Sequence, residues 1–183
     1  FGVSCVNTLT GFKYIGEKLG KYEKAIPEAL RANYRELSDE ATRELRLTHS
    51  KFFLFGGEES YGYLGADFLR DKDGNGAVVM FAELAAYAKS ENLTIPELLD
   101  QLYCRYGYHR EGQHSERLEG ADGAAKIQAL ATDYSTNPPT EIDEVPVAKV
   151  SDFITQDIQD EEGDLLPKEK MIIVDLSDGR AFA

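Results

Sequence analysis

The sequence predicts an α/β protein, because apolar runs of β type and helical patterns both occur along its 183 residues. The clearest β-type signal is the apolar run at residues 51–55, which ends at two glycines. The clearest helical signal is the capping box at residues 94–97, which precedes apolar residues at helical spacing. A chain of this length with 42% hydrophobic residues can bury one good core and a small second unit.

The first third of the chain predicts two strands and two short helices. Residues 2–6 have β-type content and lead into a turn signal, so we expect a strand that feeds a loop. Helical patterns follow at 12–19 and 38–47, and the second is entered through Ser38 as N-cap with acidic residues in its first turn. Residues 51–55 then predict a buried strand that ends in a glycine-bounded loop.

Three more helices are expected after this loop. Residues 77–88 are apolar on nearly every side, which predicts a buried core helix with Asn75 as its cap. The helix that starts at the capping box is more amphipathic, and a third helix starts at Asp122. In the first of these two helices, Leu98, Leu102 and Tyr106 fall on one face. We expect the second to bury Ile127, Leu130 and Tyr134.

A domain boundary is predicted at the two prolines that follow Asn137, because neither proline can continue a helix. We therefore expect one domain at 1–139 and the start of another at 140–183. The second contains strand-like runs at 145–150 and 171–176 and an Asp178-Gly179 hairpin turn, so its last residues are expected in a strand. Such a short unit can hardly bury a stable core alone, which suggests that the natural polypeptide continues past Ala183.

Composition restricts the function classes. With 33 acidic and 20 basic residues, the formal net charge is −13, which repels nucleic acids and anionic membranes. No run approaches the roughly 20 apolar residues that a membrane-spanning helix needs, and the N-terminus lacks the pattern of a signal peptide. We expect a cytoplasmic protein that binds neither nucleic acid nor membrane. Cys5 and Cys104 are expected to be buried free thiols.

The most informative segment is GEESYG at residues 57–62, which concentrates two carboxylates and a hydroxyl between glycines. An ionised carboxylate such as Glu58 can accept hydrogen bonds from two adjacent sugar hydroxyls, and Ser60 can donate or accept beside it. Because phosphate repels a carboxylate, we expect this loop to face a sugar ring and a basic group to hold any phosphate. The alternative interpretation is an ordinary solvated turn.

A second polar cluster follows at residues 70–76. Its D-x-D-x-N-G pattern resembles the first half of an EF-hand calcium loop, but loop position twelve is Ala82 instead of a bidentate glutamate. The other interpretation is a polar loop that leads into the next helix, with Lys72 directed back toward whatever the preceding loop binds. Lys72 is therefore the candidate cation.

These motifs resemble those of the α-D-phosphohexomutases, the phosphoglucomutase/phosphomannomutase family. The segments at 8–16, 57–62 and 70–74 follow one another in the order seen in that family, and the likeness extends over nearly the whole chain. The resemblance implies that 1–139 is an N-terminally incomplete third domain, an α/β/α layered domain with a mixed sheet. It implies that 140–183 is the incomplete start of an α+β fourth domain.

By motif position, four residues are similar to the family's hexose-phosphate contacts: Thr10, Glu58, Ser60 and Lys72. The resemblance implies that Glu58 and Ser60 hold sugar hydroxyls and that Lys72 helps to place the phosphorylated substrate. It also implies that the intact enzyme transfers a phosphoryl group from a serine to the sugar and back. Glucose 1,6-bisphosphate is then the intermediate and activator.

The chain lacks the family's phosphoserine loop, its Asp-rich magnesium loop and its RPSGTEP phosphate loop. We therefore expect no catalytic residue and no metal ligand in this segment, which is predicted to be inactive alone. Its partners are expected to be a phosphosugar and the remaining domains of the same polypeptide.

Two other function classes remain open. A non-catalytic carbohydrate-binding module normally stacks sugars on exposed aromatic residues, whereas this chain has no Trp and its Tyr and Phe residues fall largely in core patterns. A calcium-dependent structural domain needs a completed ligand loop.

Overall fold

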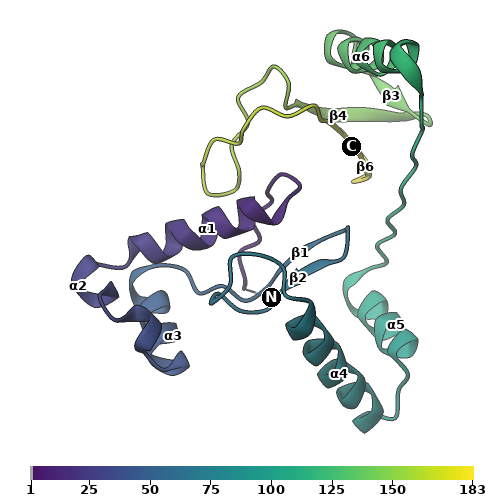
Figure 1. Cartoon of the computed structure of the whole chain (residues 1–183). Coiled ribbons are helices and arrows are strands. Elements are labelled where there is room, and N and C mark those ends of the chain that lie inside the picture. Colours follow the sequence, from purple (N-terminus) through teal and green to yellow (C-terminus); the bar gives the residue numbers. More distant parts are fainter. Residues whose placement is uncertain (1) are drawn as a thin grey trace. The chain divides into compact units, whose positions relative to one another are not determined.

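A computed structural model describes residues 2–183 and divides them into two compact units. One unit is Leu9–Glu111, and the other is Gly112–Ala183 together with the N-terminal segment up to Thr8 (Figure 1). The boundary predicted after residue 139 lies inside the second unit and stays a prediction. Both units combine helices with strands, so the predicted α/β class is confirmed.

The Leu9–Glu111 unit consists of helices around one short hairpin. Its elements are α1 (Phe12–Ala25), α2 (Glu28–Arg31), the 3₁₀ helix η1 (Tyr34–Glu36), α3 (Asp39–His49), β1 (Gly56–Glu58), β2 (Gly62–Leu64), α4 (Gly74–Ser90) and α5 (Ile95–Tyr106). The core is formed by Phe12, Leu19 and Leu64, against which Phe53 packs.

The starts of α3 and α5, which depend on local capping, agree with the sequence. Ser38 accepts a hydrogen bond from the Ala41 N–H at the start of α3, as predicted. The capping box of α5 is complete, because the Thr94 side chain accepts from the Glu97 N–H while the Glu97 carboxylate accepts from the Thr94 N–H. The predicted helix at 12–19 is confirmed within the longer α1.

The two strands predicted in this part of the sequence are wrong. Neither 2–6 nor 51–55 is a strand, and β1 begins at Gly56, just after the apolar run. It pairs with β2 in antiparallel register, with Gly57 opposite Tyr63. A β-type sequence becomes a strand only where a partner completes its hydrogen bonds, and residues 51–55 instead place single side chains, such as Phe53, against the core.

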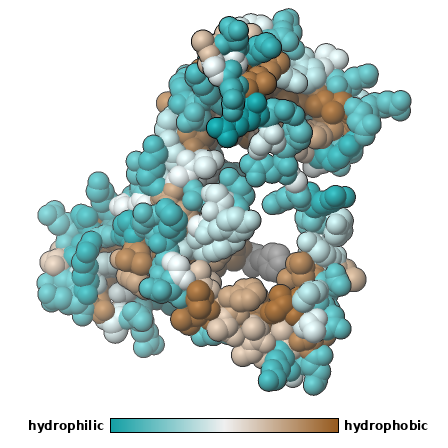
Figure 2. All heavy atoms as spheres, turned by 45° about the vertical axis from the view of Figure 1, so that its right-hand side comes forward, coloured by the Kyte–Doolittle hydropathy of each residue, from teal (hydrophilic) through white to brown (hydrophobic). Residues whose placement is uncertain are grey.

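Helix α4 is not the buried core helix that its apolar sequence predicts. It packs against β2 and α5, and Ala88 is its buried residue. The large apolar side chains of α4 are exposed, and this part of the molecular surface is apolar (Figure 2). They are Val78, which is 69% exposed, and Val79, Met80, Phe81, Leu84 and Tyr87. An apolar helix is buried all round only where neighbours cover every side, and the described residues cover one side. Its cap is Asp73, which accepts from the Gly76 N–H, and not Asn75.

The second unit has a four-stranded antiparallel sheet in the order β3-β4-β5-β6 and one helix. Its elements are α6 (Gly120–Thr136), β3 (Glu141–Ile142), β4 (Val145–Asp152), β5 (Ile172–Leu176) and β6 (Ala181–Phe182). The predicted strand at 145–150 is confirmed within β4, and the one at 171–176 is confirmed as β5, which begins one residue later. The Asp178-Gly179 hairpin turn is also confirmed, because β5 pairs with β6 across it.

Helix α6 ends at Thr136, before the prolines, as predicted. It packs against β5, and the expected burial of its apolar face is wrong: Ile127, Leu130 and Tyr134 are each about half exposed. The apolar face of α5 is also largely open, with Leu102 and Tyr106 exposed. These faces follow helical spacing correctly, but spacing alone does not supply the surface that would cover them.

Both cysteines are free thiols, as predicted, but they are exposed and not buried. Among the described residues, no helix combines the length and the apolar character needed to cross a membrane.

Candidate functional site

The candidate site lies where the loop before α1 meets the β1–β2 hairpin. The backbone N–H of Gly11 donates a hydrogen bond of 2.5 Å to Oε1 of Glu58, which is 47 residues away in sequence. This bond joins the two segments that carry Thr10 and Ser60. The structure therefore brings together two of the motifs that the sequence analysis selected.

Glu58 also completes the start of α1. The N-cap of α1 is Gly11, which has no side chain, and the first turn of the helix contains no acidic residue. The N-terminal end of a helix carries partial positive charge, which a nearby carboxylate stabilises. Glu58 supplies that charge from another part of the chain, so its carboxylate has a structural contact as well as a candidate role in binding.

The hairpin turn presents Ser60 to solvent. Glu58 pairs with Gly62 across the hairpin, and residues 59–61 form the turn between them. Tyr61, next to Ser60, has φ 66° and is 87% exposed. A positive φ is uncommon for a tyrosine and is a feature of strained functional turns as well as of tight hairpins.

Lys72 reaches the same end of this unit. Its ammonium lies 5.8 Å from the centroid of the Phe12 ring, and Phe12 is the residue that follows Gly11. Lys72 also contacts the Asp71 carboxylate, with Nζ 3.1 Å from Oδ1. Hydrogen bonds from Lys72, first from its backbone N–H and then from its side chain, lower the pKa of Asp71. The Lys72 side chain is 58% exposed, so an anion can reach it.

The loop that carries Lys72 is attached to the hairpin. The Asp73 N–H donates a 2.8 Å hydrogen bond to the Tyr63 carbonyl of β2, and the Asp73 carboxylate caps α4. Both carboxylates of the calcium-like pattern thus have other contacts. Within residues 2–183, no group of three or more His, Cys, Asp or Glu side chains could hold a metal ion.

A buried ion pair between Arg46 and Asp67, which precedes Lys72 in the same loop, was not predicted. Arg46 of α3 is 1% exposed, and its Nη2 lies 2.9 Å from Oδ2 of Asp67. Its Nε donates a 2.6 Å hydrogen bond to the Tyr34 hydroxyl, which in turn donates to Asp67. Burial raises the pKa of Tyr34 above its ordinary value. Nothing in the sequence separates Arg46 from the exposed Arg43 one turn earlier.

Arg70 fixes the same loop from the other side. Its guanidinium pairs with Glu23 of α1 and donates to the Asp67 carbonyl. The Arg70 carbonyl lies so close to Gly16 of α1 that an added Cβ would approach it to 2.6 Å. Both ends of the 67–73 segment are therefore held against the helices, and Lys72 lies within a constrained loop.

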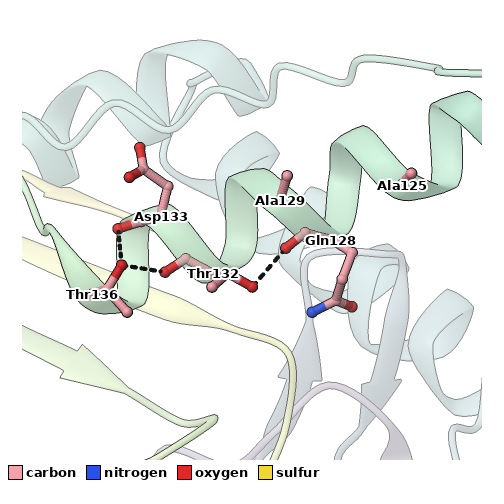
Figure 3. A pocket seen from close by; sticks show the side chains of 6 residues that line it. All are labelled: Ala125, Gln128, Ala129, Thr132, Asp133 and Thr136. Carbon is pink, nitrogen blue, oxygen red and sulfur yellow. Dashed lines mark hydrogen bonds between the residues drawn. The ribbon is translucent and has the colours of Figure 1, made fainter.

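A depression of about 560 Å³ lies in the other unit, on one face of α6 (Figure 3). Small and polar residues of that single helix line it, and the hydroxyls of Thr132 and Thr136 donate to carbonyls of their own helix. None of the four predicted site residues lines this depression, and it presents no convergent charged groups.

Comparisons with known proteins agree with the motifs. Residues 38–106 match a family described as phosphoglucomutase/phosphomannomutase, alpha/beta/alpha domain III. This range includes Glu58, Ser60 and Lys72, whereas Thr10 precedes it. No solved structure matches the chain.

Curated relatives extend this likeness over most of the chain. The chain is 31% identical over 150 residues to proteins named phosphoglucomutase from Staphylococcus aureus strains bovine RF122 / ET3-1 and USA300. It is 30% identical to that of strain MSSA476. Each match covers 82% of this chain and 23% of the relative, so the chain spans about a quarter of the length of these proteins.

Proposed function

Since the chain belongs to the phosphoglucomutase/phosphomannomutase family, we propose that it is part of an enzyme that interconverts hexose 1-phosphate and hexose 6-phosphate. The reaction would proceed through a phosphoserine and a bisphosphate intermediate. This segment would supply the sugar-recognition loop and no catalytic residue.

The observation that carries this proposal is the hydrogen bond between the Gly11 N–H and Glu58. It joins the loop of Thr10 to the loop of Ser60, and Lys72 lies over Phe12 beside them. A carboxylate, two hydroxyls and an ammonium thus belong to neighbouring segments of one unit.

The chemistry of these groups fits a sugar phosphate. Glu58 and Ser60 can exchange hydrogen bonds with adjacent hydroxyls of a hexose, and a carboxylate forms stronger hydrogen bonds than a neutral acceptor does. Lys72 would place the phosphate as a point charge. A loop that binds hydroxyl pairs could hold the sugar in both of the orientations that the bisphosphate must adopt.

Other parts of the proposed reaction would be carried by residues outside this chain. Magnesium would help to stabilise charge on the transferring phosphoryl group, but the described residues offer no cluster to ligate it. Glucose 1,6-bisphosphate would serve as intermediate and activator. The remaining domains of the same polypeptide would supply the phosphoserine, and the enzyme would be cytoplasmic.

The test compares Glu58→Ala with Glu59→Ala in the longest natural polypeptide that contains this chain. The two variants lose the same charge one residue apart, but Glu59 is exposed and lies in the turn. We expect Glu58→Ala to weaken glucose 1-phosphate binding in calorimetry by about tenfold or more, because a hydrogen bond to a charged group is lost. Equal binding by both variants would show that Glu58 does not hold the sugar.

A second candidate is a non-catalytic carbohydrate-binding module. The expectation that aromatic side chains lie mostly in the core is wrong, because Tyr61, Phe68 and Tyr108 are exposed. Tyr61 stands beside Ser60, where it could stack on a sugar ring. A measurement of mutase turnover by the intact polypeptide separates the two functions, since a binding module has none.

A further inference from the structure

Two glycines lie against the Glu58 carboxylate, one on each side of it in the chain. Gly11 donates to its Oε1, and Gly62 faces it across the β1–β2 hairpin. Gly11 has a backbone conformation that other residues rarely adopt, and Gly62 has no room for a Cβ.

Gly11 combines a hydrogen bond with a backbone that requires glycine. Its φ is 124°, in a region that side chains rarely adopt, and this conformation directs its N–H toward Glu58. The bond uses one acceptor position of Oε1 and so restricts the position of this oxygen. The other oxygen, Oε2, lies on the side of Gly62.

Gly62 leaves the space that Oε2 occupies. A Cβ added at Gly62 would lie 2.9 Å from Oε2 of Glu58 and 2.7 Å from Cε2 of Phe12. Phe12 is 3% exposed and packed in the core, so its ring cannot retreat. The half-buried Glu58 side chain is the flexible neighbour. Because the closer contact is with Phe12, a methyl group at Gly62 must shift the hairpin backbone opposite Glu58, and this shift moves the carboxylate away from the Gly11 N–H.

We propose that Gly11 and Gly62 are positioning residues that orient the Glu58 carboxylate for sugar hydroxyls, a role that rests on the proposed function of Glu58. Gly11 sets the orientation by donating to Oε1, and Gly62 sets it by leaving space for Oε2. The specificity of the site for its sugar then depends on two residues that have no side chain to contact the sugar.

The experiment is a double-mutant cycle with Gly62→Ala and Glu58→Ala in the longest natural polypeptide that contains this chain. Calorimetry measures the affinity for glucose 1-phosphate and, separately, for inorganic phosphate. We expect Gly62→Ala to weaken glucose 1-phosphate binding about tenfold and to leave phosphate binding unchanged, because phosphate makes no use of Glu58. Adding Gly62→Ala to Glu58→Ala should weaken binding no further, since the group it acts through is already absent.

Gly20→Ala is the matched control. Gly20 lies in α1, and a Cβ added there meets nothing within 4 Å, so sugar affinity should stay at the wild-type value. If Gly62→Ala fails to fold, Gly11→Ala takes its place in the cycle. Alanine keeps the backbone N–H but rarely adopts the φ of 124° that directs this N–H toward Glu58.

The outcomes separate the two proposals. If Glu58→Ala alone leaves sugar affinity unchanged, the proposed function of Glu58 fails. If Glu58→Ala weakens binding while the glycine variants do not, or if their effects add in the cycle, the positioning role is overturned. Equal weakening of sugar and phosphate binding indicates a general structural defect and also overturns it.

Discussion

Asp152, at the end of β4, accepts a hydrogen bond of 2.5 Å from the hydroxyl of Ser135 in α6. The same carboxylate accepts from the Thr155 hydroxyl and from the Ile154 N–H. Asp152 is 3% exposed, so it fixes the helix to the sheet from a buried position. It is the main polar anchor that we identify for α6.

Replacement of Asp152 by Asn should destabilise the Gly112–Ala183 unit by about 2 kcal/mol, because an amide replaces a charged acceptor of three hydrogen bonds. The free energy of unfolding, measured by urea denaturation, checks this. Asp100→Asn, at an exposed position of α5, is the control and should change little. Equal effects of the two variants would contradict the anchoring role.

The stability that Asp152 supplies should depend on pH. The hydrogen bond from Ser135, and next that from Thr155, lowers the pKa of Asp152 in the folded protein. A carboxyl whose pKa is lower in the folded than in the unfolded state stabilises the fold above the unfolded value, about 3.9, and loses this effect as pH falls through the folded value. The stability difference between wild type and Asp152→Asn should be constant from pH 7 to 5 and shrink below pH 4. A difference that grows on acidification would be inconsistent with this assignment.

The buried pair of Arg46 and Asp67 should respond unequally to loss of either partner. Asp67→Ala leaves an uncompensated guanidinium that is 1% exposed, whereas Arg46→Met leaves a carboxylate that is 19% exposed. We expect Asp67→Ala to cost about 3 kcal/mol or more and Arg46→Met to cost less, because water can still reach Asp67. Denaturation of both variants tests the order, with the exposed Arg43→Met as control. The reverse order would mean that Asp67 is the more deeply buried charge.

Tyr61 offers a test of backbone strain in the hairpin turn. Its φ of 66° costs about 1 kcal/mol for a residue with a Cβ and nothing for glycine. Tyr61→Gly should therefore be more stable than Tyr61→Ala, which retains the strain, although glycine also increases the entropy of the unfolded chain. Thermal unfolding of the pair measures the difference, and a more stable alanine variant would indicate that the turn relaxes.

The features that the sequence predicted well are those decided by neighbours in the chain. Ser38, the Thr94–Glu97 box and the Asp178-Gly179 turn each bond within a few residues, so their patterns are local. The apolar run at 51–55 and the apolar helix α4 needed distant partners to become a strand or a core element. Because no local pattern encodes such partners, those predictions failed.

The candidate site likewise contains residues that the sequence motifs identified and contacts that they did not. Thr10, Glu58, Ser60 and Lys72 were selected by motif, and whether they bind a sugar stays a prediction. The bond from Gly11 to Glu58 spans 47 residues, and the Arg46–Asp67 pair spans α3 and the loop after β2. Contacts between residues so far apart depend on the folded arrangement, and a single sequence carries no signal for them.

The exposed apolar side chains of α4 bear on how copies of this chain behave toward one another in solution. Exposed apolar patches promote association, whereas the net charge of −13 keeps copies apart. Dissolved salt screens the charge repulsion and leaves the apolar attraction intact. The chain should therefore stay dispersed at low ionic strength and associate as salt is added, which is opposite to the behaviour of a protein whose copies are held together by ion pairs.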